Sequence, residues 1–329
     1  MEEIMERVRW SRLLTVLVSV VVICAPVAAL SQAGASWSPH GSMPYERAEM
    51  AIATLNGRIY LISGGSRGVE ANAFNQEYDP ATGTWRELAL MPSVASHAGA
   101  AALNGKIYVV GGFVANVHVG AVARVFEYDP ATDRWRALAA LAAPRGSPGV
   151  VAVNGRIHAI GGRDPERRTV TTHEVYDPAT NTWSMAAPLP LARDHLGIAV
   201  VAGRIHVFGG RTEATVNNTT RHDVYDPATN AWSTAAPFIT ARSAGVVFSL
   251  AGRIVYAGGE CKDAQASVTF AEVEAYDPRT NQWTALPALA PGRHAAAAAA
   301  VGEQAYLFGG NLGCGGNRPS KEVLTFRLR

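Results

Sequence analysis

Charged residues are scarce in this chain: of its 329 residues, only 17% are Asp, Glu, Lys or Arg. The formal net charge is +2, and the sequence contains no basic block. A nucleic-acid-binding protein usually carries a basic patch or stripe, so the composition argues against a nucleic-acid partner. Apolar residues make up 48% of the chain, which excludes a disordered protein.

The helix formers Lys, Glu and Gln are also few, whereas Gly, Val, Thr and turn-forming residues are plentiful. This balance favours an all-β protein. No G-x-S-x-G nucleophile motif, Walker loop or dinucleotide fingerprint stands in a suitable context. The nine histidines show no recognisable metal-ligand spacing, and His158 and His206 are expected to pack inside strands. The sequence therefore predicts neither a cofactor nor a metal.

Cysteine is rare, with three residues, and the first of them lies in an unusual N-terminal segment. Three arginines precede an apolar run from Leu13 to Leu30, and Ala33-Gly34-Ala35 then supplies a small-x-small cleavage pattern. Residues 1–35 are therefore predicted to be a secretory signal peptide, which makes the protein secreted or periplasmic. The alternative is an uncleaved membrane anchor, because an apolar run of about 18 residues approaches spanning length.

Beyond this segment, tryptophan and paired glycine recur with a period of roughly 50 residues. The interval from Trp to the first Gly is 26 residues in five copies and 27 in the first, where Ser63-Gly64 restores the spacing. The copies begin at Trp37, Trp85, Trp135, Trp183, Trp232 and Trp283.

Each copy contains the signals of four short strands, as residues 145–189 illustrate. Asn154-Gly155 predicts a tight hairpin turn, because both residues tolerate positive φ. A Tyr-Asp-Pro sequence follows, and the interval from its Tyr to the next Trp is seven residues in five copies. The residue four positions after the Asp is Gly, Asp or Asn in each copy, which predicts the left-handed conformation there: Gly83, Asp133, Asn181, Asn230 and Asn281.

Paired glycines on a second strand, Tyr-Asp-Pro on a third and Trp on a fourth resemble the kelch repeat. The resemblance implies that residues 36–329 form one six-bladed β-propeller of four-stranded antiparallel blades, similar to the central domain of galactose oxidase. The last copy lacks its fourth strand, so we expect Ser36–His40 to complete the sheet formed by residues 293–328 and to close the ring. We expect a monomer.

Length variation is concentrated in the connection between the second and third strands, where the interval from glycine to aromatic ranges from 13 to 17 residues. The blade-to-blade connections share this face, and five of them carry an arginine: Arg47, Arg145, Arg193, Arg242 and Arg293. Arg67, Arg163 and Arg211 follow their glycines on the same face. These arginines either bind an anionic ligand or hold the blades together through carbonyls and acids, for which Glu49, Asp194 and Glu260 are the nearest partners.

We therefore predict a binding module that recognises carbohydrate or a protein segment, including anionic ligands. The predicted ligand-binding residues are Arg47, Arg145, Arg163, Arg193, Arg211, Arg242 and Arg293. The alternative is an enzyme similar to the exported kelch-like mutarotase of sialic acid, in which Glu49, Asp194, Glu260, His97 or His195 would transfer protons. The Tyr-Cys cross-link and paired histidines of kelch-containing copper-radical oxidases are not assignable. Cys261 and Cys314 lie on the same predicted face, either as a disulfide or as free thiols.

Overall fold

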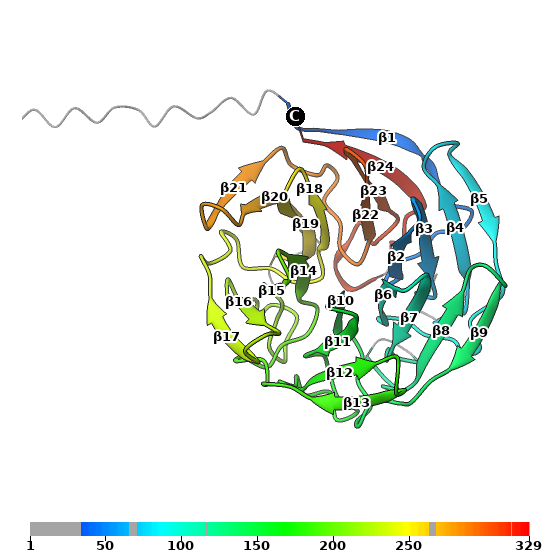
Figure 1. The fold of residues 1–329 in the computed structure, drawn as a ribbon. Coiled ribbons are helices and arrows are strands. Elements are labelled where there is room, and N and C mark those ends of the chain that lie inside the picture. Colours follow the sequence, from blue (N-terminus) through cyan, green and yellow to red (C-terminus); the bar gives the residue numbers. More distant parts are fainter. Residues whose placement is uncertain (1–33, 66–70, 116–117, 263–267, 317, 329) are drawn as a thin grey trace, which may run out of the picture. The chain divides into compact units, whose positions relative to one another are not determined.

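The computed structural model describes residues 34–65, 71–115, 118–262, 268–316 and 318–328. Six four-stranded antiparallel sheets, here called blades I to VI, are arranged in a ring (Figure 1). The first strands of successive blades pack against one another, and β22 of the last blade packs against β2 of the first. The sequence-based prediction of a six-bladed propeller is therefore confirmed.

The strands of the blades are short, mostly four or five residues. Blade I contains β2 (Ala51–Leu55), β3 (Arg58–Ile62), β4 (Asn75–Asp79) and β5 (Thr84–Glu87); blade II contains β6 (Gly99–Leu103), β7 (Lys106–Val110), β8 (Val125–Asp129) and β9 (Arg134–Ala137); blade III contains β10 (Gly149–Val153), β11 (Arg156–Ile160), β12 (His173–Asp177) and β13 (Thr182–Met185). Blade IV contains β14 (Gly197–Val201), β15 (Arg204–Phe208), β16 (His222–Asp226) and β17 (Ala231–Thr234); blade V contains β18 (Val246–Leu250), β19 (Arg253–Cys261), β20 (Thr269–Asp277) and β21 (Gln282–Leu286); blade VI contains β22 (Ala297–Val301), β23 (Gln304–Phe308), β24 (Glu322–Arg327) and β1 (Ser36–Ser42).

The ring is closed by the two ends of the described chain. Strand β1 pairs antiparallel with β24, with Trp37 opposite Phe326 (Figure 1). The Trp37 and Phe326 ring centroids lie 4.7 Å apart, so this pairing also buries aromatic surface. The predicted closure is confirmed. The predicted signal peptide falls almost wholly on residues 1–33, outside the described ranges, and within those ranges no helix has the length and apolarity needed to cross a membrane.

The turn after the third strand connects each of blades II to V to the blade before it. Asn230 has φ = 51°, as the sequence predicts, and its Oδ1 accepts hydrogen bonds from the Tyr225 hydroxyl at 2.8 Å and from the Ala187 backbone N–H at 2.8 Å. Trp232 Nε1 donates to the carbonyl of the same Ala187 at 2.9 Å. Asp133, Asn181 and Asn281 make equivalent contacts with their own tyrosines and with Ala89, Ala139 and Ala236. The constant Tyr-to-Trp interval thus reflects a repeated link between blades.

The glycine pairs form a second contact between blades, at the point where a blade meets the connection that leads into the next blade. Gly209 has φ = 58°, and a Cβ there would stand 2.7 Å from the carbonyl oxygen of Arg242. The N–H of Gly210 donates to that carbonyl at 3.1 Å. Glycine is favoured there, because a side chain would be strained in this backbone conformation and would crowd the carbonyl. In blade I, Ser63 takes the first position with φ = 56°, and the Gly64 N–H donates to Ala95 O, so the predicted Ser63-Gly64 replacement is confirmed.

The side chains of the recurring arginines are buried within the blades. Arg242 is 0% exposed, and its guanidinium bonds Glu274 at 2.6 Å and the Gly258 and Tyr256 carbonyls. Four others have comparable partners: Arg47 with Gln76, Arg145 with Glu174, Arg193 with Asp223 and Arg293 with Glu322. Burial lowers the pKa of Arg145 to about 10, which still leaves the guanidinium charged at neutral pH.

Blade II lacks both members of this pair. Ala95 replaces the arginine, and Phe126 stands two residues before Tyr128, where Glu174, Asp223 and Glu274 stand two residues before their own tyrosines. Ala95 is 3% exposed in an apolar cluster against which Phe126 packs. Either charge alone would be buried without a partner, at a high cost in free energy. Both members of the pair are therefore expected to be absent together.

Two histidine pairs occupy blades III and IV. His158 Nδ1 lies 2.9 Å from His173 Nε2, and His206 Nδ1 lies 3.0 Å from His222 Nε2. All four rings are buried, and burial lowers the pKa of His158 and of His206 to about 4. The predicted packing role of His158 and His206 is confirmed.

The arginine pairs lead to a stability prediction. Arg242→Ala leaves the Glu274 carboxylate, whose side chain is 2% exposed, without its cation. We expect the free energy of unfolding to fall by about 3–5 kcal/mol in urea denaturation, because the partner charge stays buried. Arg204→Ala is the matched control, since its guanidinium is 60% exposed beside Asp226, and should cost about 1 kcal/mol or less. Equal losses in the two variants would contradict a structural role for Arg242.

Candidate functional site

The central channel narrows at a belt of six backbone positions, each two residues after the recurring arginine position. All six residues adopt the left-handed conformation, with φ between 48° and 56°, and we call them the neck ring: Glu49, His97, Ser147, His195, Ala244 and Ala295. At five of the six positions the backbone N–H donates to the carbonyl of the neck-ring residue before it, including His97 N–H to Glu49 O at 3.0 Å and Ser147 N–H to His97 O at 2.8 Å.

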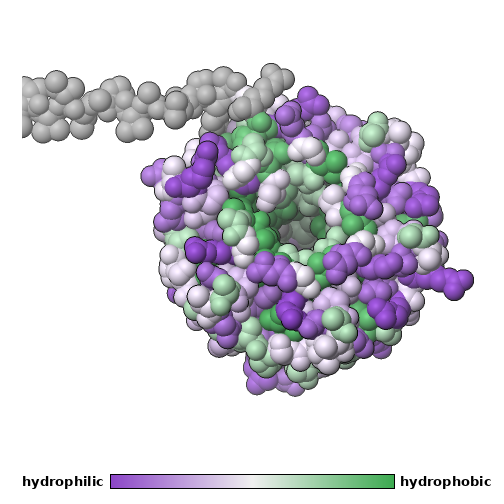
Figure 2. Space-filling model, in the orientation of Figure 1, coloured by the Kyte–Doolittle hydropathy of each residue, from purple (hydrophilic) through white to green (hydrophobic). Residues whose placement is uncertain are grey.

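The neck ring is the polar end of an otherwise apolar channel. A cavity of about 140 Å³ is lined by the six neck-ring residues and by the residue after each. A second cavity of about 340 Å³ begins at those same following residues and continues along the first strands, where its wall is Ala, Gly, Val, Ile, Leu, Met and Pro. Figure 2 shows the hollow at the centre of the ring, bordered largely by apolar and neutral residues. Four polar neck-ring side chains therefore stand at the end of an apolar channel.

Three histidines converge beside the neck. His97 and His195 belong to the neck ring, and His118 comes from the connection between β7 and β8. Their side chains are buried, with 7% to 9% of each residue exposed, and their ring centroids are 5.0 to 5.2 Å apart. His97 Nε2 lies 3.1 Å from Glu49 Oε1, and His195 Nδ1 lies 2.8 Å from Asp194 Oδ1. Each neck-ring histidine thus has a carboxylate partner.

Two arginines and a third acid complete what we call the neck cluster: Glu49, His97, His118, Arg163, Asp194, His195, Arg211 and Glu260. Asp194 has no exposed side-chain surface and receives Arg163 on one oxygen and Arg211 on the other, the latter at 3.2 Å. Arg211 also pairs with Glu260, and its Nη2 lies 3.2 Å from His195 Nε2 and 3.4 Å from His118 Nε2. Blades I to V all contribute to this cluster.

Burial and charge act on the titratable groups of the cluster in opposite directions. Burial alone would raise the pKa of Asp194, but His195 and the two guanidiniums hold it well below its usual range. Burial would likewise raise the pKa of Glu49, and the neighbouring His97 lowers it below its ordinary value. Burial lowers the pKa of His118 to about 2, so this imidazole is neutral at physiological pH. The cluster therefore combines ionised carboxylates with a neutral imidazole.

The structure separates the arginines that the sequence grouped as ligand-binding. Arg47, Arg145, Arg193, Arg242 and Arg293 have 2% or less of their surface exposed and bond within their own blades, so a ligand cannot reach them in this structure. This supports the structural alternative for these five. Arg163 and Arg211 instead belong to the neck cluster. Arg67 lies outside the described residues.

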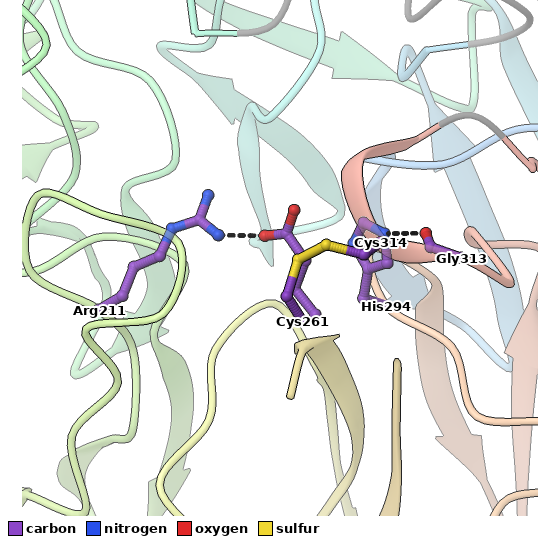
Figure 3. The surroundings of a disulfide bond; sticks show 6 residues. Arg211, Cys261, His294, Gly313 and Cys314 are labelled. Carbon is purple, nitrogen blue, oxygen red and sulfur yellow. Dashed lines mark hydrogen bonds and ion pairs between the residues drawn. A yellow bond between two sulfur atoms is a disulfide. The ribbon is translucent and has the colours of Figure 1, made fainter. Parts of the chain in front are cut away.

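A disulfide closes the loops beside this cluster. Cys261, at the end of β19, is bonded to Cys314 in a short 3-10 helix at Cys314–Gly316, with their Cα atoms 5.1 Å apart (Figure 3). The bond connects blades V and VI, as one of the two sequence-based alternatives proposed. Cys261 directly follows Glu260, the partner of Arg211, and His294 Nε2 donates to the Gly313 carbonyl on the other side (Figure 3). The disulfide thereby restrains the backbone that carries Glu260.

Sequence reasoning named five members of the cluster as proton-transfer candidates, and the structure brings all five together: Glu49, His97, Asp194, His195 and Glu260. It did not identify His118, which lies in a variable connection without a counterpart in the other copies. Ser147 was also missed, although its position two residues after Arg145 matches that of His195 after Arg193. Its Oγ lies 3.4 Å from His195 Nε2.

Comparison with known proteins agrees with this architecture. A search of curated proteins found no match. The solved structure titled "Structure of YjhT" aligns with a TM-score of 0.74 and 17% sequence identity, covering 86% of this chain and 95% of that one. This likeness shows the fold alone. Residues 95–141 match the model of the Kelch motif, and residues 140–310 match that of the KLHDC2/KLHL20/DRC7 Kelch-repeats domain. The second match covers more than half of the chain, which therefore belongs to the Kelch-repeat family.

Proposed function

We propose that this propeller binds a small carbohydrate in its central channel, with the polar groups of the ligand at the neck ring. The observation that carries the proposal is an apolar channel ending on four convergent polar side chains: Glu49, His97, Ser147 and His195. A largely apolar pocket with a few placed polar groups and shifted pKa values is the usual form of a small-molecule site. The channel volume of about 340 Å³ suits a ligand of monosaccharide size.

The neck cluster supports a ligand that carries hydroxyl or carboxylate groups. Glu49 is the most accessible of its acids, with 15% of the side chain exposed, and offers acceptors to sugar hydroxyls. Arg211 lies behind His195 and is only 1% exposed, so it would favour a carboxylate on the ligand through its charge and not through direct contact. Acidic sugars are accordingly the first ligands to test. Acidic peptides form the second group, because the sequence also pointed to a protein segment.

The binding proposal predicts the behaviour of two channel variants. Isothermal titration calorimetry with neutral and acidic monosaccharides should find a ligand whose affinity falls about 10- to 100-fold in Glu49→Gln, since a hydrogen bond to a charged group is worth about 1.5–3 kcal/mol. Ala100→Phe, in the channel wall, should abolish binding by filling the cavity.

Glu127→Gln serves as the matched control, because Glu127 pairs with Arg136 on the outer part of blade II. It should leave the affinity unchanged. If no sugar binds, or if binding survives Ala100→Phe, the channel is not a carbohydrate site; selective binding of an acidic peptide would replace carbohydrate with a protein segment.

We propose sugar mutarotation as a second candidate function. The Glu49–His97 and Asp194–His195 pairs favour it, because two carboxylate–imidazole pairs face each other with ring centroids 5.2 Å apart. Interconversion of anomers requires only proton transfers, which positioned acid–base groups accelerate. The architectural resemblance to the exported kelch-like mutarotase of sialic acid makes this sugar the substrate to test.

Proton NMR of anomerically enriched sialic acid tests this candidate directly. We expect the protein to speed equilibration over buffer, and Glu49→Gln to reduce the rate about 10²- to 10⁴-fold, as expected for loss of a general acid or base. Glu127→Gln should keep the full rate. An equilibration rate equal to that of buffer alone would remove mutarotation of this sugar.

We further propose that the protein is exported and that residues 1–35 are removed. The Cys261–Cys314 disulfide supports this, because disulfides persist mainly in oxidising compartments. Intact-mass analysis after expression in a secreting host should find a chain beginning at Ser36. A full-length mass in the membrane fraction would instead establish the anchor alternative.

A further inference from the structure

We propose that His97, His118 and His195 form a binding site for a divalent transition-metal ion, with zinc as the best match to three imidazole ligands. The site goes beyond the proposed function, and its test requires no sugar. One ligand atom from each histidine can be chosen so that all lie within 4.8 Å of one another. The spacing of the three histidines along the chain does not predict the site, because blade II supplies two ligands and blade IV the third.

The spacing of the three rings fits a metal centre, and His118 and His195 also match its nitrogen-to-nitrogen distance. His97 Nε2 lies 3.1 Å from Glu49 Oε1, a contact that a metal bound to this nitrogen would replace. In a tetrahedral site with metal–nitrogen bonds of about 2.0–2.1 Å, the ligand nitrogens stand about 3.3 Å apart and the imidazole centroids about 5.2 Å apart. The Nε2 atoms of His118 and His195 are 3.3 Å apart, and the three centroid distances are 5.0, 5.0 and 5.2 Å. The ring planes meet at 68° to 80°, so the rings surround one point instead of stacking.

The hydrogen bonds around His195 leave the required lone pair free. Its Nδ1 donates to Asp194 Oδ1 at 2.8 Å, which places the proton away from Nε2. Carboxylates commonly hold metal-binding histidines in this way. Arg211 Nη2 lies 3.2 Å from His195 Nε2 and 3.4 Å from His118 Nε2. Because an arginine N–H can only donate, both contacts indicate lone pairs directed at the same point.

Arg211 is thus the resident cation that an ion must displace from that point. Its remaining nitrogens keep Asp194 and Glu260 as partners, so Nη2 can move away without leaving the guanidinium unpaired. Three carboxylates of the cluster, those of Glu49, Asp194 and Glu260, outnumber the two guanidiniums of Arg163 and Arg211. This excess of carboxylates over guanidiniums favours a divalent cation.

All three ligand residues are buried, with 7% to 9% of each exposed, so the site is shielded from bulk solvent. Three protein ligands would leave a fourth position for water or a bound ligand, which is the arrangement of open zinc sites.

The test uses the purified protein after chelator treatment. Titration with Co²⁺ should give one equivalent of bound ion with the intense visible absorption of a low-coordinate cobalt centre, and Zn²⁺ should displace it. His118→Gln should weaken binding by about 100-fold or more, because even the loss of a residue that orients a ligand costs about 10- to 100-fold. His118 lies in a connection between strands, so this variant should keep the fold.

His206→Tyr is the matched control, because it alters a buried histidine outside the triad at a position where Tyr60, Tyr108 and Tyr306 stand in other blades. It should retain one equivalent of Co²⁺. His195→Gln provides a second triad variant if His118→Gln misfolds, as judged by circular dichroism. Absence of stoichiometric binding, or equal binding by wild type, His206→Tyr and the triad variants, would overturn the site.

Discussion

The backbone belt at the neck is the constraint on which the rest of the molecule depends. Each neck-ring residue takes a left-handed conformation, and in five of the six the N–H donates to the neck-ring carbonyl of the preceding blade. Non-glycine residues adopt this conformation at a cost, which the surrounding ring must offset. Because the backbone alone makes these contacts, the side chains are released from the scaffold and directed toward the centre. His97 and His195 can therefore come within 5.2 Å of each other although two blades separate them in the sequence.

Different residues of the repeat form different contacts between the six blades. The second glycine of each pair bonds the carbonyl of the arginine position in the next connection, while the arginine side chain turns back into its own blade. Asn230 and Trp232 fasten the outer strands to Ala187 of the preceding blade. One residue thus serves two interfaces, its backbone on one side and its side chain on the other. This explains why Ala95 can replace an arginine without disturbing the ring: the contact between blades needs only its carbonyl, and Phe126 packs against the apolar cluster that contains Ala95.

The fold was predictable because the repeated contacts are local in sequence and recur at a fixed interval. Tyr-Asp-Pro, the left-handed Gly, Asn or Asp and the tryptophan lie within eight residues, and five copies reveal them by comparison with one another. The division among the arginines was not predictable, because the position of Glu274 or Asp223 relative to Arg242 or Arg193 depends on how a blade is twisted. The neck cluster was partly visible, since His97 and His195 are equivalent positions. His118 was hidden, because a side chain from a variable connection reaches the centre only once the ring has formed.

The pairing of β1 with β24 sets an order of events for the chain. Strand β1 precedes every complete blade, and its partner follows all of them, with Ser36 and Arg327 opposite each other. Strand β1 therefore stays unpaired until β24 has been synthesised. Its sequence suits that delay: Ser, Pro, His and Gly surround a single tryptophan, and most of the strand stays exposed even after pairing. Strand β1, which completes the ring of blades, therefore has little tendency to associate prematurely with another chain.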